Sequence, residues 1–191
     1  MKLAEKKHRL PTLRNNIKVG NSLIDDENIS DRAFKWEKEF SHIMKEGKFD
    51  VIIGNPPYIR VQTIKDKDKK YLIDSYVSAR GKFDLYILFI EKSLKLLKDG
   101  GYFSFIIPNK FAQTKYGKGL KEFILNNFTI EKFIDFGDLK VFGGVTTYPC
   151  IIVIRKNKPT QTSKGVYVRV KKLSKDIEDV INKNQNKENY E

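Results

Sequence analysis

Four consecutive residues combine side-chain types that could bind a planar amine. Asn55-Pro56-Pro57-Tyr58, here called the tetrad, follows Phe49–Gly54, a short and nearly all-apolar run. The prolines fix their φ angles and lack an N–H, so the Pro56 carbonyl and the side-chain carbonyl of Asn55 are two acceptors held close together. Tyr58 adds an aromatic face for stacking. The tetrad is therefore a rigid receptor for a planar ring that bears an –NH₂ group.

Two acceptors on one exocyclic amine also indicate a reaction. The amine of adenine is conjugated with its ring and is a poor nucleophile. Acceptors that draw out both hydrogens favour a tetrahedral nitrogen whose lone pair points at an electrophilic methyl group. No covalent enzyme intermediate is needed, and Cys150 lies in an apolar run typical of a core. The alternative is that the two prolines simply end a strand and Tyr58 packs nearby.

Strand-like and helix-like segments alternate around the tetrad. The composition of Phe49–Gly54 predicts a strand buried on both faces. The alternation predicts an α/β domain with a largely parallel sheet and helices on both faces, with ligands beyond the carboxyl ends of the strands. Further strands are expected at residues 17–19, 102–107, 129–136, 150–155 and 166–170, helices at 31–46, 84–98 and 115–127, and a loop or short helix at 65–79.

Composition narrows the class of protein. The net charge of +13, from 37 Lys+Arg against 24 Asp+Glu, favours a polyanionic partner, although a Lys-rich composition alone could produce it. The single cysteine excludes an internal disulfide and a Cys-rich zinc module, so no metal is expected. No apolar stretch reaches the length of a membrane span, and a reducing cytosol is expected.

Phe49–Arg60, FDVIIGNPPYIR, resembles the catalytic motif of the amino-methyltransferases that modify adenine N6 in DNA. From about Ile17 to Lys156 the chain is similar to the methyltransferase region of type IIG restriction-modification enzymes, in which one polypeptide both methylates and cleaves. The resemblance implies a partial Rossmann-like, class I S-adenosylmethionine-dependent methyltransferase fold in a prokaryotic cytoplasm. It also implies S-adenosylmethionine as cofactor and double-stranded DNA as substrate, with the target adenine flipped out of the duplex.

The resemblance assigns roles in cofactor binding. Ile17–Leu23, IKVGNSL, resembles the motif whose polar residue contacts the cofactor adenine, here Asn21 with Ser22, although many relatives have Asp at the first position. Asp84 opens a helix that lines the site in the family, and Phe105 would pack against the cofactor adenine. Asn21 could instead be a turn residue, Asp84 a helix N-cap and Phe105 ordinary core.

The resemblance also assigns the substrate base. Asn55 and the Pro56 carbonyl would bind the amine of the flipped adenine, Pro57 would stiffen the tetrad, and Tyr58 would stack on the ring. Phe142 falls where relatives have a loop aromatic that stacks on the same base, but beside two glycines it could merely mark a turn.

One family feature has no counterpart in the chain. The glycine-rich loop that holds the methionine part of the cofactor should precede Ile17, yet residues 1–16 contain no glycine. We therefore expect a basic segment at 1–16, an incomplete methyltransferase region at 17–156, and a linker and the start of a target-recognition domain or tail at 157–191. The rest of a larger polypeptide, with nuclease and target-recognition domains, is the expected partner.

Three other functions stay open at this stage. The chain could be a truncated, inactive DNA-binding remnant of such an enzyme. Relatives with the same tetrad methylate amines in RNA or protein, but the basic surface favours DNA. A dinucleotide-binding oxidoreductase is disfavoured because its glycine-rich fingerprint is missing from the sequence.

Overall fold

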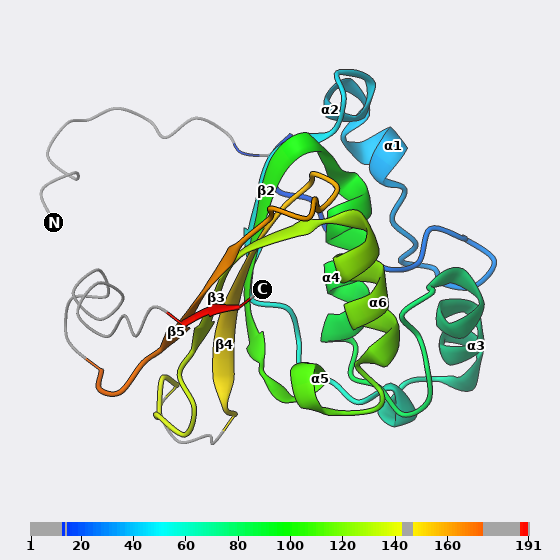
Figure 1. Cartoon of the computed structure of the whole chain (residues 1–191). Helices are drawn as coiled ribbons and strands as arrows, with labels where there is room; N and C mark the ends of the chain where they lie inside the picture. Colours follow the sequence, from blue (N-terminus) through cyan, green and yellow to red (C-terminus); the bar gives the residue numbers. More distant parts are fainter. Residues whose placement is uncertain (1–12, 14, 143–146, 174–187, 191) are drawn as a thin grey trace, which may run out of the picture.

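The computed structural model describes residues 13, 15–142, 147–173 and 188–190. Within them, one mixed sheet has the strand order β1-β2-β4-β3-β5-β6 (Figure 1). The strands are β1 (Phe49–Gly54), β2 (Leu97–Pro108), β3 (Thr129–Asp135), β4 (Pro149–Arg155), β5 (Gly165–Arg169) and β6 (Glu188–Tyr190). The helices are α1 (Trp36–Glu39), α2 (Ser41–Lys45), α3 (Asp66–Ser75), α4 (Tyr86–Leu96), α5 (Lys110–Gln113) and α6 (Lys118–Asn127), with a 3₁₀ turn η1 (Val61–Thr63). The expected α/β class is confirmed.

The strand directions are more mixed than the sequence indicated. β1 runs parallel to β2 and β3 runs parallel to β5, as expected. β4, however, is antiparallel to both of its neighbours, β2 and β3, and β6 is antiparallel to β5. β4 can reverse direction because the chain enters it from β3 through a loop, and antiparallel neighbours need no helical crossover.

The described helices that pack on the sheet cover one of its faces, not both. α4 contacts β2 and α6 contacts β3. Figure 1 shows both helices on the same side of the sheet, and no described helix on the other. The crossover from β1 to β2 and the one from β2 to β3 step across the sheet in the same direction. Right-handed crossovers in one direction place their helices on one face.

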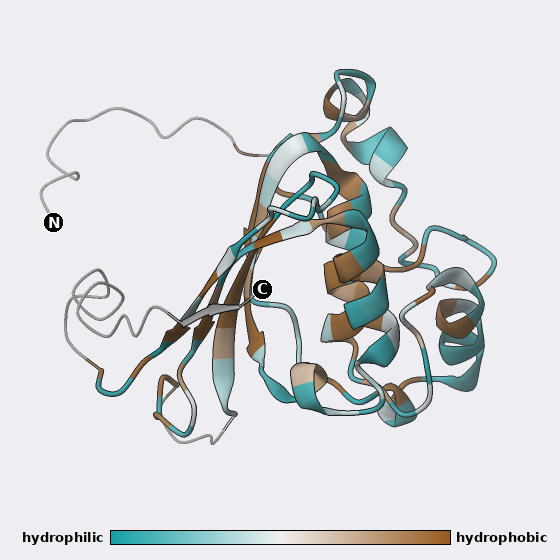
Figure 2. Cartoon of the chain, in the orientation of Figure 1, coloured by the Kyte–Doolittle hydropathy of each residue, from teal (hydrophilic) through white to brown (hydrophobic). Residues whose placement is uncertain are grey.

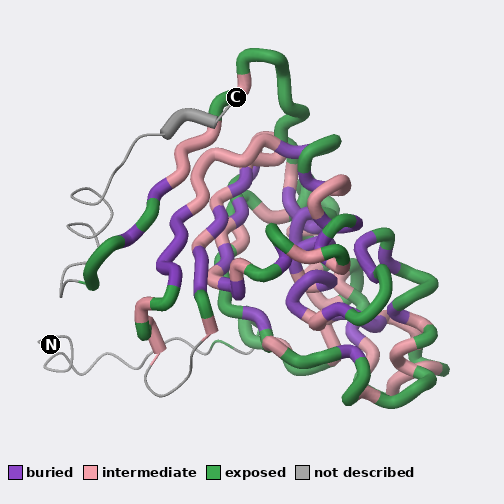
Figure 3. The backbone as a smooth tube through the Cα atoms, turned by 60° about the horizontal axis from the view of Figure 1, so that its bottom comes forward, coloured by how far each residue is buried: buried purple, intermediate pink, exposed green. Residues whose placement is uncertain are grey.

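The hydrophobic core lies between this face and α4. The predicted helix at 84–98 is confirmed, and Ile87, Leu88, Ile90 and Leu94 of α4 are completely buried. Alternate residues of β2 and β4 meet them from the sheet, including Phe103, Ile107, Cys150, Ile152 and Ile154. Figure 2 shows apolar residues along these strands and along α4, and Figure 3 shows buried residues in the sheet and in the helices packed on it. The expected core position of Cys150 is confirmed.

Packing of α4 gives a prediction about stability. Replacing Leu88 by Ala is expected to lower the free energy of unfolding by about 2–5 kcal/mol, because it leaves a cavity in a rigid core. Leu125→Ala on α6 is the matched control, since that side chain is 59% exposed. Its expected effect is within about 0.5 kcal/mol of zero. Urea denaturation followed by circular dichroism measures both, and equal effects would contradict this placement of the core.

The strand that leads into the tetrad lies at an edge of the sheet. Among the described residues, β1 pairs with β2 alone. Val51 is 57% exposed and Ile53 is 76% exposed, whereas Ile52 packs against the core. The expectation that both faces of this strand are buried is therefore wrong, because alternate side chains of β1 point to the face without a described helix.

The N-terminal elements also differ from those expected. Residues 17–19 form no strand, and Asn21 makes only an isolated bridge with Ala33. The helix expected at 31–46 is divided into α1 and α2 at Phe40, whose φ of −123° and ψ of 43° are not helical. Ring centroids are 5.6 Å apart for Trp36 and Phe40, and 5.7 Å apart for Phe40 and Phe49. The aromatic spacing reflects this cluster rather than one continuous helix.

Candidate functional site

The tetrad leaves the sheet where β1 ends. Pro56 is buried, whereas the side chains of Asn55 and Pro57 are exposed and Tyr58 is half-buried. Gly54 pairs with Phe105, so the end of β1 lies level with the last residues of β2. A backbone that is fixed by two prolines at a strand end thus presents the Asn55 amide outward, as a ligand-binding site at this edge requires.

Two contacts fix the position of Tyr58. Its hydroxyl donates to the carbonyl oxygen of Ile106 on β2 at 2.9 Å. Its ring meets the buried ring of Tyr86 edge-on, with centroids 6.0 Å apart and planes at 77°. Burial, and to a smaller extent the thiol of Cys150, raises the pKa of Tyr58 to about 12. The phenol of Tyr58 therefore stays neutral at physiological pH. Tyr58 contributes an aromatic ring to the site, and its two contacts hold that ring in place.

The chain after the tetrad is tied to the start of α4. The N–H of Leu85 donates to the carbonyl of Ile59 at 2.7 Å, and the N–H of Val61 donates to the carbonyl of Phe83 at 3.0 Å. Asp84 faces Arg60 across this bridge. These bonds bring Asp84 close to the tetrad although 26 positions separate Asp84 from Tyr58 in the chain.

Asp84 does not act as the helix cap that was one of its two expected roles. Leu85 is the N-cap of α4, and no side chain caps that end. Burial raises the pKa of Asp84, and the positive charges of Arg60 and Lys110 oppose the rise. The carboxylate thus lies at the site edge between two basic residues, and its role toward the cofactor stays a prediction.

Asn21 and Ser22 form a hydrogen-bonded turn. The N–H of Leu23 donates to the side-chain oxygen of Asn21 at 3.2 Å, so this amide holds the turn, as the alternative reading expected. The indole N–H of Trp36 donates to the Ser22 carbonyl at 3.1 Å. The turn function of Asn21 leaves its amide NH₂ with capacity to donate to a ligand.

A cleft of about 290 Å³ runs beside the outer edge of β1. Ser22, Trp36, Phe49 and Phe89 are among the residues that line it, so it is mainly apolar and aromatic. Sequence reasoning missed Phe89, because an aromatic residue inside an apolar helix reads as core. No local signal in the sequence could have revealed it, because only the tertiary structure places Phe89 beside β1.

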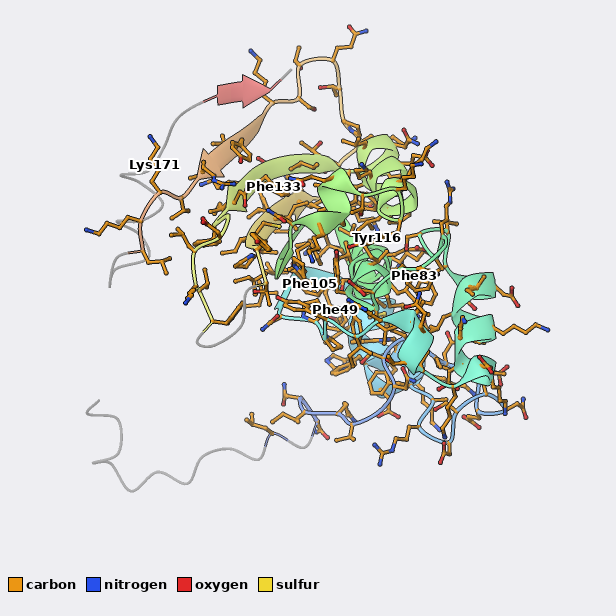
Figure 4. All side chains as sticks on the ribbon, turned by 90° about the horizontal axis from the view of Figure 1, so that it is seen from below. Phe49, Phe83, Phe105, Tyr116, Phe133 and Lys171 are labelled. Carbon is orange, nitrogen blue, oxygen red and sulfur yellow. The ribbon has the colours of Figure 1, made fainter. Side chains whose placement is uncertain are left out.

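Phe105 lies beneath the tetrad and is 6% exposed. Its ring packs 4.4 Å from the ring of Phe103, and a Cβ added at Gly54 would come 3.0 Å from its edge. Figure 4, seen from the end where β2 leads into α5, shows Phe105 inside the molecule. Its contacts are those of a core residue that supports the strand end, and its packing against a cofactor ring stays a prediction.

Phe142 is half-buried and is the last described residue of the loop that follows β3. The two glycines after it lie outside the described residues. Its stacking on a substrate base therefore stays a prediction. Among the described residues no cluster of three or more His, Cys, Asp or Glu could hold a metal ion. No helix of the described chain is both long and apolar enough to cross a membrane.

Comparison with known sequences identifies close relatives. The model of the Eco57I restriction-modification methylase family matches residues 1–142. The type II restriction enzyme and methyltransferase RM.Eco57I of Escherichia coli is 40% identical over 153 residues, which are 77% of this chain and 15% of that protein. The type II methyltransferase M.BstVI of Geobacillus stearothermophilus is 33% identical over 169 residues, 86% of this chain and 30% of that protein. The chain thus spans less than a third of either relative.

Solved structures share the fold at lower identity. A Listeria monocytogenes protein described as a class I S-adenosylmethionine-dependent methyltransferase superposes with a TM-score of 0.55 at 21% identity, covering 72% of this chain and 40% of its own. The type IIL restriction-modification enzyme MmeI, solved with DNA, gives 0.54 at 18% identity and covers 72% of this chain and 18% of its own. The chain belongs to the Eco57I restriction-modification methylase family and has the α/β fold of class I S-adenosylmethionine-dependent methyltransferases.

Proposed function

We propose that this chain is the catalytic core of a site-specific DNA adenine-N6 methyltransferase of a restriction-modification system. The observation that carries the proposal is the tetrad at the end of β1, with Asn55 exposed and Tyr58 held by Ile106 and Tyr86. The family relatives RM.Eco57I and M.BstVI are named as methyltransferases, which supports it.

The residues of the tetrad have different roles toward the substrate adenine. The side-chain oxygen of Asn55 and the carbonyl of Pro56 accept the two amine hydrogens of a flipped adenine, which localises the nitrogen lone pair. Tyr58 stacks on one face of the base and Phe142 on the other. Bound S-adenosylmethionine supplies the electrophilic methyl group. As the new N–C bond would form, the methyl–sulfur bond of the sulfonium would break and leave a neutral thioether, and the amine would lose one proton to the solvent beside the exposed Asn55.

The residues present fit part of the cofactor. The cleft beside β1 offers the rings of Trp36 and Phe89 to a planar heterocycle, with Ser22 and the nearby Asn21 as hydrogen-bonding groups. These groups suit the adenine of S-adenosylmethionine. The methionine part needs a further segment, and the rest of a larger polypeptide is the proposed source of it, since the chain spans 15% of RM.Eco57I and 30% of M.BstVI.

This division predicts weak cofactor binding by the isolated chain. Calorimetric titration of the 191-residue chain with S-adenosylmethionine is expected to give no low-micromolar binding, because contacts to the methionine part are missing. Adenosine at millimolar concentration, which lacks that part, is the matched ligand and should bind about as well. Low-micromolar binding of the whole cofactor, at least tenfold tighter than adenosine, would contradict the prediction.

Double-stranded DNA is the proposed partner. Arg60 and Lys110 are exposed next to the tetrad, and the chain carries a net charge of +13. Basic residues beside a base pocket can neutralise the phosphates on either side of the flipped nucleotide.

The proposal is tested by methyl transfer. The protein, expressed from its complete reading frame, is mixed with labelled S-adenosylmethionine and unmethylated plasmid DNA. Label is expected in N6-methyladenine after digestion to nucleosides. Label found only in RNA or protein substrates offered in parallel would overturn the DNA assignment.

A further inference from the structure

The loop that follows β3 is folded back onto the sheet before it reaches Phe142. The N–H of Phe136 donates to the carbonyl of Pro149 at 3.1 Å, and the N–H of Leu139 donates to the carbonyl of Phe136 at 3.1 Å. Leu139 and Val141 pack against a small apolar cluster that contains Phe136. The described part of this loop, which leads to Phe142, is therefore held by Phe136, Leu139 and Val141 and by the contacts of its first turn.

Asp135, the last residue of β3, holds that turn. Its Oδ1 accepts from the N–H of Gly137 at 2.9 Å and from the side-chain NH₂ of Asn109 at 3.1 Å. Its Oδ2 accepts from the Tyr167 hydroxyl at 3.1 Å and from the guanidinium of Arg169. A carboxylate has about four lone-pair sites, so these four donors use its full capacity.

These four donors come from separate parts of the chain. Asn109 follows β2, Tyr167 and Arg169 lie on β5, and Gly137 belongs to the loop. Gly137 has a φ of 56°, and a Cβ added there would lie 2.2 Å from the guanidinium of Arg169. The left-handed backbone favours glycine at this position, and a Cβ there would displace the guanidinium of Arg169. We call Asp135 with these four donors the Asp135 anchor.

The carboxylate of the Asp135 anchor is buried, and burying a charge opposes folding. Asp135 is 6% exposed, and burial alone would raise its pKa. Hydrogen bonds from Gly137 and Asn109, with the charge of Arg169, outweigh that effect and leave the pKa below its usual value. The carboxylate is thus ionised at neutral pH, although desolvation of a buried charge opposes folding.

The anchor is also close to the tetrad. Cys150 pairs with Asp135 on one side and with Ile107 on the other, so the three residues form one row across β3, β4 and β2. The hydroxyl of Tyr58 binds the carbonyl of Ile106, the neighbour of Ile107. Two adjacent rows of the sheet therefore contain the support of Tyr58 and the support of the loop that carries Phe142.

We propose that Asp135 is a positioning residue for methyl transfer. It fixes the turn at Gly137 so that Phe142 lies over the base held by Asn55 and Tyr58. This role of Asp135 rests on the proposed function. Asp135 itself does not touch the substrate. Its action is through Phe142, so the two residues should be coupled.

A double-mutant cycle tests this coupling. The single-turnover rate of methyl transfer to unmethylated plasmid DNA is measured, in the protein expressed from its complete reading frame, for wild type, Asp135→Asn, Phe142→Ala and the double variant. Each single variant is expected to be slower by about tenfold to a hundredfold, since a small misplacement of a stacking group has effects of this size. The double variant should be at most about threefold slower than Phe142→Ala, because the anchor has no Phe142 left to position.

Three controls separate the possible outcomes. Asp138→Asn removes an exposed carboxylate of the same loop and should leave the rate unchanged. Tyr167→Phe removes one donor of the anchor and keeps the ring, so it carries the test if Asp135→Asn does not fold. Thermal melting monitors folding of each variant. Additive losses, or an unchanged rate in a folded anchor variant, would overturn the role of Asp135.

Asn55→Ala in the same assay distinguishes this failure from failure of the proposed function. Loss of label with Asn55→Ala but not with Asp135→Asn overturns the anchor alone. Label that survives Asn55→Ala overturns the proposed function, and the role of Asp135 falls with it.

Discussion

Replacing Asn55 by Ala is expected to slow methyl transfer to adenine by about 100-fold to 1,000-fold, the usual effect of removing one preorganised hydrogen-bonding group from a reacting centre. The substitution deletes one of the two acceptors on the amine and leaves the Pro56 carbonyl. The side chain of Asn55 is exposed and no other described residue bonds to it, so the melting temperature should not change. Single-turnover labelling with S-adenosylmethionine measures the rate.

Two further variants test whether the expected loss is due to the hydrogen-bond acceptor of Asn55. Asn55→Asp keeps an oxygen acceptor at the same place and should retain more activity than Asn55→Ala. Asn126→Ala removes an exposed amide of α6, at the opposite end of the sheet from the tetrad, and should be as fast as wild type. If Asn55→Ala and Asn126→Ala gave equal rates, Asn55 would have no part in binding the amine.

The second large effect is expected at Tyr58. Tyr58→Ala should slow the reaction by about tenfold to a hundredfold, because stacking of a base on an aromatic side chain contributes about 1–3 kcal/mol. Tyr58→Phe keeps the ring and loses only the bond to the Ile106 carbonyl, which contributes about 1 kcal/mol to stability. It should melt earlier than wild type and react within about fivefold of the wild-type rate, as one hydrogen bond away from the base implies.

The same pair of variants separates the ring from the hydroxyl. Burial keeps the Tyr58 phenol neutral, with a pKa of about 12, so no ionised form is available to act as a base at neutral pH. The rate of Tyr58→Phe should therefore have the same pH dependence as wild type between pH 6 and pH 9, a range well below that pKa. A rate for Tyr58→Phe as low as that for Tyr58→Ala would assign the chemistry to the hydroxyl.

Much of the fold could be predicted from local pattern. α4 was recognisable because its apolar residues recur with helical period over a long stretch, and β2, β3 and β4 because their apolar runs are short and rich in branched side chains. The reversed direction of β4 was not recognisable, since a buried strand has the same pattern whichever way it runs. The break at Phe40 was hidden because aromatic residues at near-helical spacing also suit a cluster of rings.

By itself, the sequence determined the chemistry that this chain can offer: Asn55 and Tyr58 stand beside two prolines at the end of an apolar run, and that information is local. The tertiary structure alone decided which distant residues support them. Ile106 and Tyr86 hold Tyr58, Phe89 lines the cleft beside β1, and four donors from three regions meet on Asp135. Such contacts depend on strand order and register, because bonds between residues far apart in the chain leave no periodic signal in one sequence.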